Sequence, residues 1–107
     1  MTKRRDIILA KVFFSDAPDA KIRPCVVLSQ ENYESGFILV SPITSSRDEH
    51  CIKISKPDST CELAGGSSAR ADVILRISSE NKMRRIGQVT SAFYNRLVEH
   101  LLKLIQD

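Results

Sequence analysis

Cysteine and histidine are the residue types in this chain that most often carry covalent or metal chemistry. The chain contains Cys25, Cys51, Cys61 and two histidines, of which His50 directly precedes Cys51. No pair has the Cys-x-x-Cys spacing by which a turn presents two thiolates to one zinc ion. Three cysteines without an export signal do not predict a disulfide framework. Cys25 lies in an apolar run, so we interpret it as a buried small hydrophobe, and we expect no metal site.

Basic side chains, which could bind a polyanion, are concentrated in two stretches. Sixteen Lys and Arg against 13 Asp and Glu give a net charge of +3. The first group is Lys3, Arg4 and Arg5, and the second is Arg70, Arg76, Lys82, Arg84 and Arg85. The fold could gather both groups on one face that binds nucleic acid, or leave them as solvated ends of strands and loops. The modest net charge alone favours the second interpretation.

The length and composition predict one small globular domain. The chain has 107 residues, of which 42% are hydrophobic and 27% charged, so we treat residues 1–107 as a single domain. No apolar run approaches the roughly 20 residues of a membrane span. The first residues lack the apolar core of a signal peptide. We therefore expect a cytoplasmic protein.

Short extended segments must position the polar and charged side chains. Runs rich in β-branched residues predict strands at residues 6–14, 24–29, 37–44, 50–55, 69–78 and 83–89. The longest turn-rich segment, residues 56–68, is the expected flexible loop. Pro42 cannot donate a hydrogen bond to a ladder, so it should lie at a sheet edge, a bulge or the end of its strand.

The C-terminal part of the chain is the one segment with a helical pattern. Thr90 or Ser91 can cap a helix. An apolar stripe follows at spacings of three and four residues, formed by Tyr94, Leu97, Val98, Leu101, Leu104 and Ile105. Many short strands before one amphipathic helix predict a mainly β fold: a strongly bent sheet or partly open barrel of five to six strands, with the helix packed on it.

Four segments, in their order along the chain, resemble the MazF/PemK family of toxins. They are Asp6-Ile-Ile-Leu, Arg23-Pro-Cys-Val-Val-Leu-Ser, Ser41-Pro-Ile-Thr-Ser and Arg85-Ile-Gly-Gln-Val before the terminal helix. These toxins are ribonucleases of toxin–antitoxin systems. The resemblance covers nearly the whole chain and implies an SH3-like barrel, a homodimer, no cofactor and a cognate antitoxin partner. It also implies metal-independent cleavage of single-stranded RNA at short sequences, leaving a 2′,3′-cyclic phosphate and a 5′-hydroxyl.

The resemblance makes Arg23 and Thr44 the candidate catalytic residues. Attack by a ribose 2′-hydroxyl on the adjacent phosphorus adds negative charge to the phosphoryl oxygens, so the site needs a fixed cation and hydrogen-bond donors. Arg23 stays protonated and its planar fork suits phosphate, so we expect a transition-state clamp and not a base. Thr44 would supply a hydroxyl donor. The group that accepts the proton stays open, and Asp16 and Asp19 are candidates by position only.

Four further residues beside this pair are candidates for RNA binding, namely Lys21, Ser45, Ser46 and Arg47. The chain also departs from the family. Family toxins commonly carry Gly where this chain has Arg5. Many carry Asp-Gln-Ile-Arg where this chain has Asp72-Val-Ile-Leu. The polar contacts of that segment are therefore in doubt at Val73 and Leu75, with Arg76 as a candidate substitute.

Two other functions are compatible with the same fold. A non-catalytic module would use a basic face to hold RNA or a protein, which the divergence at Val73 and Leu75 favours. A gyrase-poisoning relative would need the tryptophan that such toxins carry at the C-terminus, and the end Leu104-Ile-Gln-Asp lacks it.

Overall fold

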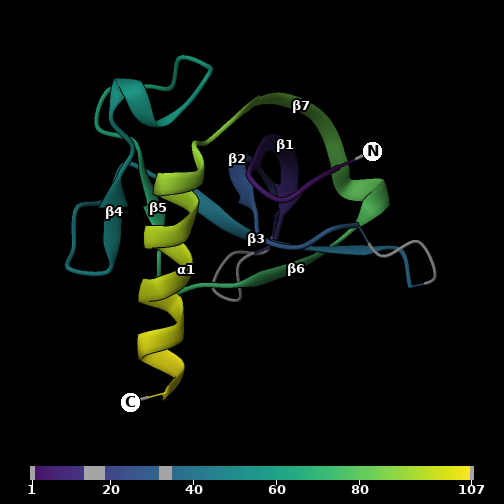
Figure 1. Cartoon of the computed structure of the whole chain (residues 1–107). Coiled ribbons are helices and arrows are strands. Elements are labelled where there is room, and N and C mark those ends of the chain that lie inside the picture. The colour runs from purple at the N-terminus through teal and green to yellow at the C-terminus, as the bar shows by residue number, and fades with distance from the viewer. Residues whose placement is uncertain (1, 14–18, 32–34, 107) are drawn as a thin grey trace.

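The fold is a curved antiparallel sheet with one helix across it (Figure 1). The structure, a computed structural model, describes residues 2–13, 19–31 and 35–106. These residues form the strands β1 Asp6–Val12, β2 Lys21–Val27, β3 Phe37–Thr44, β4 Cys51–Lys53, β5 Ser68–Arg70, β6 Leu75–Ser78 and β7 Lys82–Gln88, followed by the helix α1 Ser91–Gln106. Short 3-10 turns, η1 Lys56–Asp58 and η2 Ser79–Asn81, precede β5 and β7. The strand order is β4-β5-β3-β2-β1-β7, and β6 also pairs with β3.

The two ends of the sheet meet through a loop. Ser59, after η1, forms a bridge with Val89 just beyond β7. The Thr60 amide donates to the Gln88 carbonyl at 2.9 Å. Figure 1 shows this loop beside the junction of β7 and α1. The prediction of a mainly β, partly open barrel with a C-terminal helix is confirmed, with seven strands among the described residues instead of five to six.

The predicted strand over residues 69–78 is wrong, because two shorter strands pair with different parts of β3. β6 pairs with β3 residues 37–40, whereas β5 pairs with Ile43 and Thr44. Pro42 lies between these two pairings, where β3 changes partner, so its missing N–H costs no ladder bond to β5 or β6. The hydroxyl of the neighbouring, fully buried Ser41 donates to the Arg70 carbonyl at 2.6 Å.

The second predicted strand begins earlier than expected. We predicted residues 24–29, and β2 spans Lys21–Val27. The difference arises because Lys21 and Ile22 pair with Val12 and Lys11 of β1. Cross-strand pairing extends the strand over polar residues that have no strand pattern of their own. Arg23 consequently lies inside a strand and not ahead of one.

Both faces of the sheet are buried. The inner face of the barrel is packed by Ile8, Ala10, Val12, Cys25, Val27, Ile38, Val40 and Ile77. The opposite face packs against α1 through a second cluster that includes Ile7, Val26, Ile43, Phe93, Leu97 and Leu101. Successive side chains of a strand point to opposite faces, so β1 sends Ile7 to the helix side and Ile8 into the barrel. The middle strands are therefore held between two cores.

Helix α1 begins where the sequence predicts a cap. The Thr90 hydroxyl oxygen accepts a hydrogen bond from the Phe93 amide at 3.2 Å, which makes Thr90 the capping residue. Tyr94, in the first turn, donates its hydroxyl to the Leu28 carbonyl at 2.7 Å. This bond ties the helix to the end of β2. No helix among the described residues is long and apolar enough to cross a membrane.

The predicted apolar stripe of α1 is buried along part of its length only. Leu97 and Leu101 are in the core, whereas Leu104 is 45% and Ile105 70% exposed. Figure 1 shows the reason, since the last turns of the helix extend beyond the sheet. The prediction that the whole stripe packs on the sheet is therefore wrong for the final turn.

Candidate active site

A pocket of about 630 Å³ lies where β2 and β3 extend past the barrel core. Its walls are Lys21, Arg23, Pro24, Pro42, Ile43, Thr44, Ser45, Ala64, Ser67 and Arg70. The structure thus brings together both predicted catalytic residues and two of the predicted RNA-binding residues. Neither Ser46 nor Arg47 lines it.

Strand register places the two predicted catalytic residues opposite each other. β2 pairs Cys25 with Pro42 and Val26 with Ser41. Continuing this antiparallel register by two residues puts Arg23 across from Thr44. Alternate residues of a strand share a face, so Arg23 lies on the face of Cys25, which is buried in the barrel. Arg23 and Thr44 therefore continue the inner face of the barrel to its rim, where solvent reaches it.

Arg23 and Lys21 are the free cations of this pocket. Both are exposed, and in the described part of the chain neither side chain forms an ion pair. The neighbouring Cys25 thiol instead donates to the Arg23 backbone carbonyl at 3.6 Å, which leaves the guanidinium untouched. An uncompensated guanidinium on a rigid strand is suited to a phosphate, because its fork can donate two parallel hydrogen bonds.

The Thr44 hydroxyl is partly engaged by its own strand end. Its oxygen accepts a hydrogen bond from the Ser46 amide at 3.2 Å, and it also donates to the Ser46 hydroxyl at 3.4 Å. The first bond is a local turn contact of the kind that Thr commonly makes. The second is long for a bond between hydroxyls and correspondingly weak. The Thr44 proton can therefore turn to a stronger acceptor, such as a phosphate oxygen.

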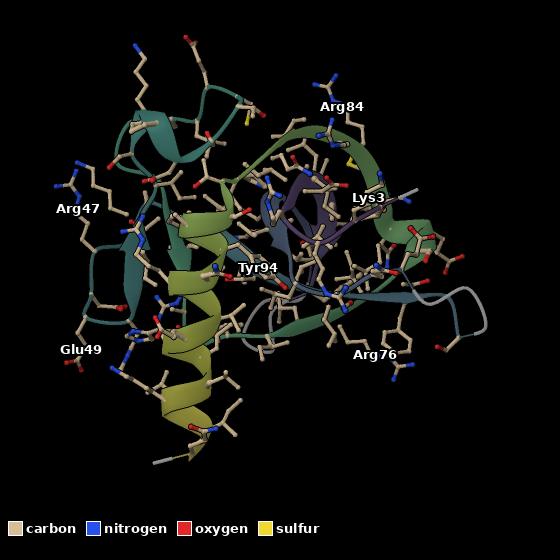
Figure 2. The ribbon with its side chains drawn as sticks, in the orientation of Figure 1. Lys3, Arg47, Glu49, Arg76, Arg84 and Tyr94 are labelled. Atoms are coloured by element: carbon tan, nitrogen blue, oxygen red, sulfur yellow. The ribbon has the colours of Figure 1, made fainter. Side chains whose placement is uncertain are left out.

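Ser46 and Arg47 lie beside the pocket. Ser46 bonds to the Thr44 hydroxyl, which lines the pocket. Arg47 lines a different, small pocket of about 160 Å³ with Asp48, Cys51 and Ser68 among its walls. A Cβ atom on Gly66 would lie 3.0 Å from Nη2 of Arg47, so the guanidinium rests against that glycine. Figure 2 shows Arg47 at the outer side of the molecule, pointing away from the barrel.

Arg70 is a wall of the pocket that the sequence placed only among the basic residues. Its guanidinium donates to Asp48 at 3.0 Å and to Asp72 at 2.8 Å. The hydrogen bond that Arg70 donates to Asp72 is the largest cause of the raised pKa of Arg70, and Arg70 in turn lowers the pKa of Asp72. Two carboxylates neutralise this cation, so Arg70 shapes the pocket without adding free positive charge. In the sequence, Asp72 lies two residues after Arg70, which is a weak indication of this contact. Nothing in the sequence indicated the contact between Arg70 and Asp48.

The described walls of the pocket contain no carboxylate and no imidazole. Asp19 is exposed and does not line the pocket, and Asp16 lies outside the described residues. The ring of His50 contacts the ring of His100, and Nδ1 of His50 lies 3.3 Å from Nε2 of His100.

Cys25 is buried, as its apolar sequence context predicts. Cys25 is fully buried, and burial raises the pKa of its thiol to about 12. All three cysteines are free. Within the described ranges, no three His, Cys, Asp or Glu side chains converge on one point.

Three residues of the two basic groups, Arg70, Lys82 and Arg85, form ion pairs with carboxylates. Lys82 bonds Glu31 at 2.7 Å, and Arg85 bonds the buried Asp6 at 3.0 Å. The Arg76 guanidinium stacks on the Phe37 ring at 4.4 Å. Figure 2 shows Lys3 and Arg84 on one side of the molecule and Arg47 on the other. One residue from each basic group, Lys3 and Arg84, thus lies on the same side of the molecule, whereas Lys21 and Arg23 are the cations that line the pocket.

The departures from the family pattern lie away from the pocket. Leu75 pairs with Val40, and Arg76 with Leu39, in the first half of β3, whereas Thr44 ends that strand. Arg76 consequently does not replace a polar contact in the pocket. Arg5, at the position where the family commonly has Gly, adopts a φ of +76°. This left-handed conformation favours glycine, which explains the family's preference there.

Known proteins share this architecture. The chain matches the family described as PemK-like, MazF-like toxin of type II toxin-antitoxin system over residues 3–105. A MazF toxin from Mycobacterium tuberculosis is 21% identical, with 95% of this chain and 97% of that one covered and a TM-score of 0.74. An endoribonuclease in complex with its cognate antitoxin, from a mycobacterial species, is 15% identical, with coverage of 98% and 93% and a TM-score of 0.74.

The crystal structure of MazE–MazF from Deinococcus radiodurans gives a TM-score of 0.78 at 14% identity, covering 98% of this chain and 96% of that one. No curated protein sequence matches the chain. At these identities the structural likeness establishes the fold. Because the family match extends over nearly the whole sequence, the chain belongs to the PemK-like, MazF-like toxins of type II toxin–antitoxin systems.

Proposed function

We propose that this toxin is an endoribonuclease that cleaves single-stranded RNA, including mRNA, at selected short sequences without a metal ion. The observation that carries the proposal is the pocket at the barrel rim, which is lined by both Thr44 and Arg23, a cation with no ion pair among the described residues. Family membership and the endoribonuclease among its structural neighbours support the same activity.

Cleavage proceeds by attack of the ribose 2′-hydroxyl on the adjacent phosphorus. The bond from O2′ to phosphorus forms and the bond from phosphorus to O5′ breaks, which leaves a 2′,3′-cyclic phosphate and a 5′-hydroxyl. Arg23 donates two hydrogen bonds to the non-bridging oxygens as their charge grows, and Thr44 donates a third. The proton of O2′ must leave and O5′ must gain one. The described walls of the pocket offer no side-chain base, so no residue is assigned to this proton.

The remaining walls of the pocket position the strand. Lys21, two residues from Arg23, is a second cation without an ion pair in the described ranges, and it would bind a neighbouring phosphate. Ser45 offers a hydroxyl beside Thr44. Ser46 holds the Thr44 oxygen, and Arg47 offers a further cation in the small pocket that it lines. These four residues form the proposed RNA-binding set.

An antitoxin would inhibit the enzyme by covering this pocket. Two structural neighbours were crystallised with an antitoxin. The free charges of Lys21 and Arg23 would attract an acidic, extended segment of such a partner in place of RNA. We further propose that the toxin acts as a homodimer in the cytoplasm, where mRNA is available.

A substrate that lacks the attacking 2′-hydroxyl tests the proposed cleavage mechanism. An oligonucleotide that the toxin cuts should resist cutting when the nucleotide 5′ to the cut carries 2′-deoxyribose, because the nucleophile is then missing. The same replacement two nucleotides away serves as the control and should leave cutting in place. Cutting at an unchanged rate on the 2′-deoxy site would contradict the mechanism. Tight binding of RNA that stays intact in every case would instead support the non-catalytic binding module.

A further inference from the structure

A second hollow adjoins the Arg23–Thr44 pocket. It has a volume of about 610 Å³ and is formed by the loop between β4 and β5. Ala64 lines both hollows. The Ser67 hydroxyl, on the wall of the first pocket, donates to the Ala64 carbonyl at 2.6 Å, and the Ser67 amide donates to it at 3.1 Å. One tight turn therefore separates the two hollows, and a single extended strand can occupy both.

The far wall of this second hollow is fixed to the sheet. Thr60 accepts a hydrogen bond from the Gln88 amide at 2.9 Å and donates its own amide to the Gln88 carbonyl. Cys61 packs so closely on β7 that a Cβ atom on Gly87 would lie 2.7 Å from its side chain. The hollow is accordingly preformed, and a ligand would not have to order the loop.

The chemistry of the hollow fits a nucleotide. Lys53 and Lys56 are exposed on its wall, and in the described part of the chain neither forms an ion pair. Glu62 is exposed there and likewise unpaired among the described residues. Ile54 and Leu63 supply apolar surface. Ammonium groups bind phosphate, apolar side chains cover the face of a base, and a carboxylate accepts hydrogen bonds from an amino group on a base edge.

We propose that this hollow binds a nucleotide flanking the cut and thereby sets part of the sequence selectivity of the toxin. Lys56 and Lys53 hold its phosphate, and Glu62 accepts a hydrogen bond from a base that carries an exocyclic amino group. The inference rests on the proposed ribonuclease activity. RNA is the occupant because the hollow continues the pocket at the scissile phosphate and because its free cations outnumber its free carboxylate.

Cut-site mapping on a pool of RNA with random sequence tests this subsite. Glu62→Gln should change the base preference at one position near the cut by at least about 5-fold and leave other positions as they were, since an amide also donates. Glu99→Gln removes an exposed carboxylate from α1 and is the matched control. Lys56→Ala should slow cutting equally for all sequences and reduce the salt slope by about 1, as expected for a phosphate contact. Lys103→Ala, on the last turn of α1, is its control.

The outcomes separate the subsite from the activity it depends on. A wild-type protein that cuts, together with a Glu62→Gln variant that is folded and retains the same preference at every position, would overturn the subsite and leave the ribonuclease intact. A folded wild-type protein that cuts no RNA would overturn the proposed function, and the subsite with it. Lys56 and Glu62 are exposed, so we expect neither variant to change the melting temperature. An unchanged melting temperature would exclude unfolding as the cause of an effect on cutting.

Discussion

Arg23 and Thr44 each lie two residues beyond the last pair of the β2–β3 ladder, which joins Cys25 to Pro42. Both line one pocket at the rim of the barrel. Each strand therefore contributes one hydrogen-bond donor to the pocket. We propose that the two donors bind one phosphate, because electrostatic stabilisation of a transition state requires donors around the developing charge.

The Thr44 hydroxyl should contribute to the rate and little to the fold. Thr44→Val keeps the β-branched shape and should lower kcat by about 100-fold, the usual effect of losing one transition-state donor. Thr44→Ser retains the hydroxyl and should keep most of the activity. Single-turnover rates on one oligonucleotide, with melting temperatures alongside, separate the two contributions. A fully active valine variant would remove Thr44 from the mechanism.

Arg5 should carry measurable backbone strain, because its φ is +76°. Arg5→Gly and Arg5→Ala both lose the bonds of the guanidinium to the Val89 carbonyl and the Gln88 side chain. Only glycine adopts this φ without a Cβ clash, which costs other residues about 1 kcal/mol. In urea unfolding, the glycine variant should therefore be more stable than the alanine variant. Equal stability of the two would show that the φ is unstrained in solution.

Gly87 should be required for the loop to pack on β7. The Cβ atom of Gly87→Ala would lie 2.7 Å from Cβ and Sγ of Cys61, and overpacking of this kind costs about 1–3 kcal/mol. Adding Cys61→Gly removes both clashing atoms and should recover part of the loss. The four proteins of this double-mutant cycle, compared by thermal unfolding, give the coupling between the two sites. Additive effects would contradict the contact.

Cys25 should resist thiol reagents in the folded protein. Burial raises its pKa from 9.0 to about 12, so at any pH below about 9 its thiolate fraction falls about 1,000-fold. Cys51 and Cys61 are partly exposed and should react with iodoacetamide first. Mass spectrometry of labelled peptides, with urea-unfolded protein as the control, checks this order. Labelling of native Cys25 as fast as Cys61 would mean that the barrel core opens readily.

The sequence predicted local features of the fold well. The capping oxygen of Thr90 and the buried Leu97 follow from spacing that short-range rules describe. The division of residues 69–78 into two strands did not follow, because it depends on where β3 exchanges partners at Pro42. That exchange is a property of strand pairing, which no local pattern encodes.

The candidate site was predicted through the family resemblance, and the residues themselves explain why it was needed. Arg23 and Thr44 are 21 residues apart, and only the register of β2 with β3 brings them together. From its residue type alone, Arg23 would be interpreted as an ordinary surface arginine. One of the two carboxylates that neutralise Arg70, Asp48, lies 22 residues away in the sequence, so the charge of Arg70 looked as free as that of Arg23 until the fold was known.

The most direct test of the account is to map new 5′-hydroxyl ends on a long, weakly structured RNA. The purified toxin, free of antitoxin, is incubated with the RNA in the presence of a chelator, beside Arg23→Ala and the charge-matched control Lys103→Ala. The account predicts discrete cuts by the wild type and the control, and a loss of at least about 100-fold in the folded Arg23→Ala variant. Intact RNA with folded wild-type protein, or equal cutting by Arg23→Ala, would contradict it.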